Sequence, residues 1–151
     1  MRDIKLEVMF YVFNQNMEKE IKKHYTTVDR LCKSNDFFKQ DLEVLCKRQY
    51  TYLKDKNGVE IYEGDIVDCY WLAELGFCEI DCQHKGIVRF VDCRFEVSFS
   101  DKAFIRNIGE DGVYSATELE LTCMSHDDDY AVEYEVIGNI YENPELLKAP
   151  N

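Results

Sequence analysis

Hydrophobic and polar residues alternate along much of this chain with a period of two, which is typical of β-strands that bury one face. The alternating runs are rich in β-branched and aromatic residues, and short clusters of Asn, Asp, Ser and Gly that favour turns separate them. Helical periodicity is confined to Val28–Lys33, where Thr26-Thr27 can cap a short helix. The pattern predicts a mainly β (α+β) protein, with strand segments at residues 4–13, 18–25, 42–50, 59–61 and 134–141, a further strand that starts at 66–67, and a hairpin within 86–99.

The stretch Tyr50–Val67 carries the strongest local signals, because two turns and a strand follow one another within it. Asn57-Gly58 predicts a type I′ hairpin turn, which needs positive φ at two successive residues. Glu63-Gly64-Asp65 predicts a second turn, in which the Asp65 carboxylate can accept hydrogen bonds from nearby backbone N–H groups. The succession of strand, turn, Gly-Asp and strand is typical of small SH3-like barrels.

Further along the chain, residues 86–99 predict a second hairpin, whose hydrophobic residues face one another across a turn at Asp92-Cys93. Ser115 and Glu118 have the spacing of a capping box and predict a single helical turn. Tyr134–Tyr141 is the predicted closing strand, and Asn143-Pro144 starts a last turn. Both hairpins are expected to belong to one barrel that this strand closes.

The chain has 151 residues, of which 46% are hydrophobic, and this is enough for one domain with its own core. Residues 1–49 are expected to form an N-terminal α/β arm packed on the barrel, and residues 50–151 the SH3-like barrel part, as one structural unit. No apolar run reaches the roughly 18–20 residues that a membrane span requires. Acidic residues interrupt the apolar segment near the N-terminus, so a secretory signal is excluded and a cytoplasmic location is expected.

The net charge of −12 is unevenly distributed. Residues 1–50 contain ten Lys and Arg against eight Asp and Glu, a net of +2, whereas residues 51–151 contain eight against twenty-two, a net of −14. A dense negative surface can simply keep a protein soluble, or it can resemble a phosphate backbone to a protein that binds nucleic acid. Direct binding of nucleic acid by the acidic part is disfavoured, because phosphate contacts need Lys and Arg.

Seven cysteines leave one without a partner, which favours reduced thiols in the core over a disulfide framework. Cys78 and Cys82, and likewise Cys123 and His126, have spacings that a zinc site could use. The first pair, however, alternates as in a strand, whereas zinc ligands usually lie on tight turns. The acidic run His126–Asp129 lacks the alternating ligands of a calcium loop. We therefore predict no metal and no cofactor.

No catalytic constellation is apparent in the sequence. It has neither a glycine-rich phosphate loop nor a nucleophile elbow, and most cysteines alternate into predicted strands beside acidic residues, which do not activate a thiolate. We predict that the protein is not an enzyme. Tyr70 and Trp71 belong to an apolar cluster that either fills the core or forms a contact patch, since Trp and Tyr often anchor partners.

Three segments carry a resemblance to a known family. They are LKDKNGVEIYEGDIV at 53–67, GIVRF at 86–90 and YEVIGNIYENPELL at 134–147, and they resemble the YopX-like family of phage and prophage proteins; the start MRDIKLEV is a weaker match. The resemblance implies a phage origin and a mostly β fold with a barrel-like part, and it supplies no catalytic residues. The family usually has Gly at the position of Tyr52, and the stretch 68–84 is insertion-like, so a member-specific activity is expected there.

These observations favour a phage-encoded, non-enzymatic protein that inhibits a host protein, such as a nucleic-acid-binding defence factor, through an acidic face that mimics nucleic acid. One alternative is an SH3-like adaptor in phage DNA metabolism, and another is a protein that sequesters a small ligand. A homo-oligomer is compatible with each of them. The adaptor would use the basic residues Lys19, Lys22, Lys23, Arg30, Lys33, Lys47 and Arg48. The candidate partner-binding residues of the acidic face are Tyr52, Glu60, Glu63, Asp65, Asp68, Tyr70, Trp71, Asp127, Asp128, Asp129 and Glu133.

Overall fold

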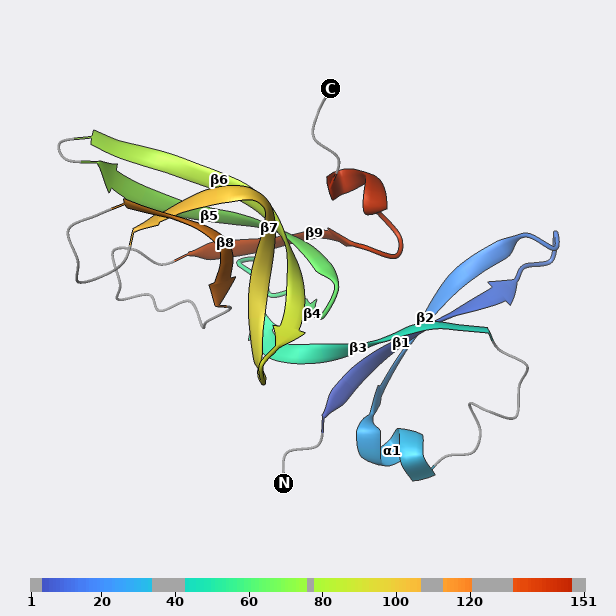
Figure 1. Cartoon of the computed structure of the whole chain (residues 1–151). Coiled ribbons are helices and arrows are strands. Elements are labelled where there is room, and N and C mark those ends of the chain that lie inside the picture. The colour runs from blue at the N-terminus through green and yellow to red at the C-terminus, as the bar shows by residue number, and fades with distance from the viewer. Residues whose placement is uncertain (1–3, 34–42, 76–77, 107–112, 121–131, 148–151) are drawn as a thin grey trace. The chain divides into compact units, whose positions relative to one another are not determined.

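The structure is a computed structural model that describes residues 4–33, 43–75, 78–106, 113–120 and 132–147 (Figure 1). For residues 71–75, 78–82, 100–106 and 113–120 it describes the backbone alone. Almost all the described elements are strands, and they confirm the predicted mainly β fold. The elements are β1 (Lys5–Phe13), β2 (Lys19–Thr27), α1 (Val28–Lys33), β3 (Glu43–Lys54), β4 (Glu60–Tyr62), β5 (Asp65–Leu75), β6 (Cys78–Val91), β7 (Arg94–Arg106), β8 (Val113–Glu120), β9 (Glu133–Asn139) and the 3-10 helix η1 (Pro144–Leu147).

The strands form two sheets, ordered β2-β1-β3-β4 and β8-β7-β6-β5-β9. The chain divides into two compact units, Met1–Tyr50 and Thr51–Asn151, which we call unit 1 and unit 2 and describe separately. In unit 1, β1 lies between β2 and β3 and is antiparallel to both. Val8 and Met9 of β1 are adjacent and both fully buried. Thr27 caps α1, as the sequence predicts, because its Oγ1 accepts the N–H of Arg30 at 3.4 Å.

Unit 2 contains the barrel-like part. Its strands β6 and β7 curl strongly, so that the five-stranded sheet wraps around a core of buried side chains (Figure 1). Ile61 of β4 belongs to the same core, although its strand is in the other sheet. The predicted small β-barrel part is thereby confirmed. The core residues are Ile61, Val67, Cys69, Val88, Val97, Phe99 and Tyr134.

The two predicted hairpins do not share one sheet. The β3–β4 hairpin belongs to the four-stranded sheet, whereas the β6–β7 hairpin belongs to the five-stranded sheet. Each region around the first hairpin is bonded to the five-stranded sheet: the N–H of Gly64, in the turn after β4, donates to the carbonyl of Val88 in β6 at 2.8 Å, and the N–H of Lys56, in the β3–β4 loop, donates to the carbonyl of Tyr134 in β9 at 3.0 Å. The strand β9 therefore pairs with β5 along one edge and meets the β3–β4 hairpin along the other.

The turn at Asn57-Gly58 is not the predicted type I′ turn, because Gly58 has positive φ (81°) and Asn57 does not. The N–H of Gly58 donates to the Asp55 carbonyl at 2.9 Å, and the N–H of Asp55 donates to the Val59 carbonyl at 2.8 Å. The loop therefore has three residues and ends on a left-handed glycine. The Asp55 side chain accounts for the difference, since its Oδ1 accepts the N–H groups of Asn57 and Val59, both at 2.8 Å.

Unit 1 contains the same loop between β1 and β2. The N–H of Met17 donates to the Asn14 carbonyl at 3.0 Å, and the N–H of Asn14 donates to the Glu18 carbonyl at 2.9 Å. The Asn14 Oδ1 accepts the N–H groups of Asn16 and Glu18, as Asp55 does in unit 2. The left-handed position that Gly58 fills in one loop is occupied by Met17 (φ 61°) in the other.

A type I′ turn occurs at Asp92-Cys93 instead, where φ is 48° and 65° and the loop has two residues. The predicted register of this hairpin is confirmed, with Phe90 opposite Phe95 in the ladder. The predicted helical turn at Ser115–Glu118 is wrong, because these residues lie in β8, which pairs with β7. Pairing along the open edge of β7 outweighs the local capping signal.

The end of unit 2 follows the prediction with a small shift. The predicted closing strand ends at Asn139 rather than Tyr141, and the last turn is present as η1. The N–H of Leu146 donates to the Asn143 carbonyl at 3.1 Å and closes this turn. Val136 is paired with Val67 of β5 and partly buried, as expected for a strand of the barrel.

Candidate partner-binding site

Asp55 connects the β3–β4 hairpin to β9 through its side chain. The residue is 4% exposed. Its Oδ1 accepts the two loop N–H groups, and its Oδ2 accepts the N–H of Val136, 81 residues further along the chain, at 3.0 Å. A carboxylate that accepts three backbone N–H groups makes charge-assisted hydrogen bonds, which are stronger than neutral ones. Asp55 is therefore a structural residue of unit 2.

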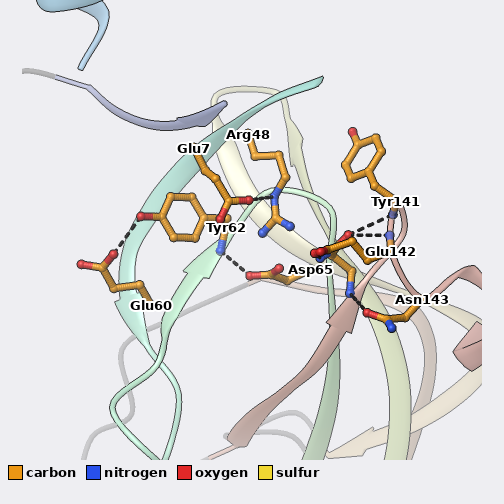
Figure 2. A network of polar contacts seen from close by, with 9 residues as sticks. Glu7, Arg48, Glu60, Tyr62, Asp65, Tyr141, Glu142 and Asn143 are labelled. Carbon is orange, nitrogen blue, oxygen red and sulfur yellow. Dashed lines mark hydrogen bonds and ion pairs between the residues drawn. The ribbon is translucent and has the colours of Figure 1, made fainter. Parts of the chain in front are cut away.

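The turn between β4 and β5 has a similar role. Gly64 takes positive φ (82°), and a Cβ there would lie 3.1 Å from the ring of Tyr141. The Asp65 Oδ2 accepts the N–H of Tyr62 at 2.6 Å, which confirms the predicted hydrogen bond to a nearby backbone group (Figure 2). Asp65 is 4% exposed, so it is not a surface residue, contrary to its assignment to the acidic face.

The segment after β9 is held by a third polar side chain. The Oδ1 of Asn139 accepts the N–H groups of Tyr141 at 3.0 Å and Glu142 at 2.9 Å, two residues that Figure 2 labels. A Cβ at Gly138 would lie 2.7 Å from the Asn143 Oδ1. Together with Asp55 and the Gly64 turn, these contacts give a structural role to Asp55, Asp65 and Asn139, which lie in the segments that resemble the family. These three polar residues serve the fold of unit 2.

Tyr52 has φ of 67°, which lies in the left-handed region that favours glycine. This conformation costs a residue with a Cβ about 1–2 kcal/mol relative to Gly. It agrees with the expectation, from the family resemblance, of Gly at this position, where the chain instead has an aromatic side chain that is 40% exposed.

Among the candidate residues, the structure brings Asp68, Tyr70 and Glu133 together on the neighbouring strands β5 and β9. Asp68 lies opposite Glu135 in the ladder, and Tyr70 lies opposite Glu133. The next strand, β6, contributes Gln83, whose Nε2 donates to the Tyr70 hydroxyl at 3.0 Å and to the Asp68 Oδ2 at 3.3 Å. These side chains form one polar patch across three strands.

Lys56, from the β3–β4 loop, completes this patch. Its Nζ lies 2.7 Å from the Glu135 Oε2 and 4.4 Å from the centroid of the Tyr70 ring. Sequence reasoning includes Glu135, beside Glu133, in the acidic face, but it misses Lys56 and Gln83. These two residues are placed only by loop geometry and strand register. We call the whole patch the Asp68 cluster: Lys56, Asp68, Tyr70, Gln83, Glu133 and Glu135.

The Asp68 cluster contains three carboxylates and one ammonium group. The hydrogen bond to Glu135 raises the pKa of Lys56, which keeps this side chain protonated. Partial burial raises the pKa of Tyr70, and the charge of Asp68 acts in the same direction. Asp68 is 7% exposed, contrary to its assignment as a surface residue, and no described group donates a hydrogen bond to its buried Oδ1. The cluster therefore has an unused acceptor under its surface.

The other candidate residues are dispersed. Glu60 is partly buried and accepts the hydroxyl of Tyr62 at 2.8 Å (Figure 2), and Glu63 is partly buried on the following turn. Trp71 lies opposite Cys82 in the β5–β6 ladder, and its side chain is outside the described part. Asp127–Asp129 also lie outside the described residues.

The basic residues of unit 1 are largely neutralised by carboxylates. Arg48 is buried, and its Nε lies 3.3 Å from the Oε1 of the equally buried Glu7 (Figure 2). This residue cannot contact nucleic acid as the adaptor hypothesis requires. Three exposed lysines of the arm also form ion pairs, namely Lys19 with Glu43 (2.9 Å), Lys22 with Glu20 (3.3 Å) and Lys33 with Asp29 (2.7 Å).

Within the described side chains, no three His, Cys, Asp or Glu residues are arranged as a metal site. Cys78 and Cys82 lie on the backbone of β6, whereas Cys123 and His126 fall outside the described residues, so the absence of zinc stays a prediction. In the same part of the chain, no helix has the length and apolar character needed to cross a membrane.

The fold and the Asp68 cluster define a small β-barrel protein with a negatively charged polar patch. The chain belongs to the YopX family, whose model, described as YopX protein, matches residues 3–148. Membership in this family indicates a phage-type protein. The chain is similar to a solved structure, protein EF1440 from Enterococcus faecalis, with 30% identity, coverage of 93% of this chain and 75% of that chain, and a TM-score of 0.37. No curated protein matches the chain.

Proposed function

We propose that this chain is a phage-encoded, non-enzymatic binding protein that inhibits a host protein through the acidic surface of unit 2. The observation that supports the proposal best is that the boundary in net charge falls at the boundary between the two compact units. The net charge changes from +2 to −14 at residue 50, and the chain divides into its two compact units between Tyr50 and Thr51. The negative charge is thus a property of one folded unit.

The proposed partner is a protein of the bacterial cytoplasm with a basic groove for nucleic acid, such as a host defence factor. Complementary charge raises the rate of association, and the effect weakens as salt increases. Aromatic side chains that become buried lengthen the life of a complex. Unit 2 offers both features, with the Asp68 cluster and with Tyr52, which is 40% exposed.

The adaptor hypothesis is less well supported. Nucleic acid would have to compete with the carboxylates that already contact Lys19, Lys22 and Lys33, and Arg48 is buried. A lysine adds to the affinity for nucleic acid when it contacts a phosphate and displaces a counterion. Because these lysines already contact carboxylates, their ion pairs lower the expected affinity of unit 1 for nucleic acid.

The test starts with capture of the partner from a nuclease-treated host lysate, followed by measurement of association and dissociation rates at several salt concentrations. A triple variant, Glu63→Lys, Glu133→Lys and Glu142→Lys, should slow association by about tenfold or more at low salt. The control is a triple variant of unit 1 with the same change in net charge, and it should change association by less than about threefold. Its substitutions are Glu18→Lys, Asp29→Lys and Glu43→Lys.

Equal association rates for the wild type and the unit 2 variant would contradict the proposal. Retardation of DNA by the protein alone at physiological salt would also contradict it and would favour the adaptor. Charge reversal at Asp127–Asp129 should act like the unit 2 variant, and Trp71→Ala should speed dissociation.

A further inference from the structure

Lys56 shows that the Asp68 cluster can hold a cation. Its ammonium group lies between the Glu135 carboxylate, at 2.7 Å, and the face of the Tyr70 ring, at 4.4 Å from the centroid. A cation over an aromatic face beside a carboxylate is a favourable arrangement. The side chains of Lys56 and Glu135 are 32% and 34% exposed, so this place is open to solvent.

Asp68, another carboxylate of the cluster, is left without a full set of hydrogen bonds. Its Oδ2 has two long contacts, 3.3 Å to the Gln83 Nε2 and 3.5 Å to the Tyr70 hydroxyl, and its Oδ1 has no donor. An acceptor that is buried without a donor is costly, most of all on an ionised group. The two groups that contact the neighbouring Oδ2, Gln83 and Tyr70, are exposed and partly exposed, so they can move aside.

We propose that the Asp68 cluster is the binding site for an arginine side chain of the partner, and that Lys56 occupies this site in the free protein. The inference rests on the proposed function and names the group that the acidic surface recognises. A guanidinium group is planar and presents five N–H donors, so it can stack on Tyr70 while it donates to Asp68 and Glu133. It is also more weakly hydrated than an ammonium group, which lowers the cost of entering a half-buried site.

Lys56 can leave without disturbing the fold. Its backbone N–H is bonded to the Tyr134 carbonyl at 3.0 Å, and only its side chain extends over the cluster. Displacement of this side chain frees Glu135 and the Tyr70 face for the incoming cation. Lys56 therefore acts as an internal competitor, and its removal should strengthen the binding of arginine.

The test uses a tri-arginine peptide and a tri-lysine peptide as probes, with dissociation constants measured by titration calorimetry at physiological salt. Lys56→Met should tighten tri-arginine binding by about tenfold. The matched control is Lys54→Met, which removes the same charge from an exposed lysine two residues away and should change binding by less than about threefold.

Asp68→Asn should weaken tri-arginine binding by about tenfold or more, because it removes the charge of the buried acceptor. Asp92→Asn makes the same charge change on the exposed β6–β7 turn and should have little effect. Tyr70→Leu should remove the preference of the wild type for tri-arginine over tri-lysine. Backbone amide NMR spectra of each variant establish that it is folded.

The site is refuted if Lys56→Met binds tri-arginine no better than Lys54→Met, or if Asp68→Asn binds it as well as Asp92→Asn does. Either result leaves the proposed function standing, because that proposal is tested by the association rates of the host partner. Conversely, if acid reversal in unit 2 leaves those rates unchanged while the peptide results hold, the proposed function fails and the arginine site remains.

Discussion

Asp55→Asn tests how unit 2 is held together, because the chain contains its own control for the substitution. Asn14 already makes the same loop in unit 1, where its Oδ1 accepts two backbone N–H groups. An amide at position 55 can therefore keep the hydrogen bonds of the β3–β4 loop. It cannot keep the bond to β9, since the Nδ2 that replaces Oδ2 would face the N–H of Val136, which is also a donor.

The magnitude follows from what is lost. A hydrogen bond to a charged group contributes about 1.5–3 kcal/mol, and the Val136 N–H lies in a partly buried contact where water replaces it poorly. The hydrogen bonds within the β3–β4 loop are present in both the wild type and the variant, so they do not change the free energy of unfolding. We expect Asp55→Asn to lower the free energy of unfolding of unit 2 by about 2–3 kcal/mol.

The assay is urea unfolding combined with amide hydrogen exchange. With a slope of roughly 2 kcal/mol per molar urea, the midpoint of unit 2 should fall by about 1 M. The Val136 amide should lose protection, whereas that of Val59, inside the loop, should keep it. Because the two units can unfold separately, these amides identify which transition has moved.

The matched substitution in unit 1 is Asn14→Asp. It keeps the Oδ1 acceptor but replaces the Nδ2 that donates to Glu18 and Glu20, both at 3.0 Å, with a charged oxygen that repels them. Because these side chains lie near the surface and can turn toward water, it should cost about 1 kcal/mol or less. A cost of less than about 0.5 kcal/mol for Asp55→Asn, or continued protection of Val136, would refute the cross-link between hairpin and β9.

Three further predictions concern strain, burial and metal. Gly58→Val should cost about 1–3 kcal/mol in urea unfolding from left-handed strain alone, since a Cβ at this position would meet nothing within 4 Å, and Met17→Gly in the twin loop should stabilise by about 1 kcal/mol. Burial raises the pKa of Cys69 to about 12, so peptide mapping after alkylation at pH 8 should show it reacting far more slowly than the exposed Cys32 and Cys93. The unfolded thiol ionises from about pH 8.5 while the folded one does not, so Cys69 should also reduce stability progressively above that pH. Purified protein should contain no stoichiometric zinc, and a large fall in Tm on adding a chelator would contradict this.

The hairpins of unit 2 were predictable because their signals are local. A short group of turn-forming residues between two segments that alternate hydrophobic and polar residues predicts a hairpin, independently of its tertiary contacts. The turn type at Asn57-Gly58 was not predictable from that dipeptide, because the Asp55 carboxylate selects a three-residue loop. The strand at Val113–Glu120 was missed for the opposite reason: its local capping signal favours a helix, and only the edge of β7 makes it a strand.

The candidate site was only partly accessible from the sequence. Asp68 and Glu133 were identified as acidic residues near predicted strands, but their proximity depends on the β5–β9 register, which pairs residues about 65 positions apart. Burial of Asp65 and Asp68 could not be inferred from polarity, since buried carboxylates with backbone or side-chain donors have the same sequence signature as surface ones. The contact between Lys56 and Glu135 was not predictable, because the direction of the Lys56 side chain depends on the loop conformation that Asp55 stabilises.

Two large side chains occupy left-handed positions where the backbone favours glycine, Met17 in unit 1 and Tyr52 in unit 2. Each costs about 1–2 kcal/mol relative to Gly, and each has a side chain at the surface, 77% and 40% exposed. Polar residues of the family segments, such as Asp55 and Asn139, are accounted for by the fold, whereas these two residues oppose it locally. Strain of this kind clusters at sites of function. Within unit 2, recognition of the partner is therefore sought at Tyr52, which costs stability, and at the Asp68 cluster, rather than at the polar residues that the fold already uses.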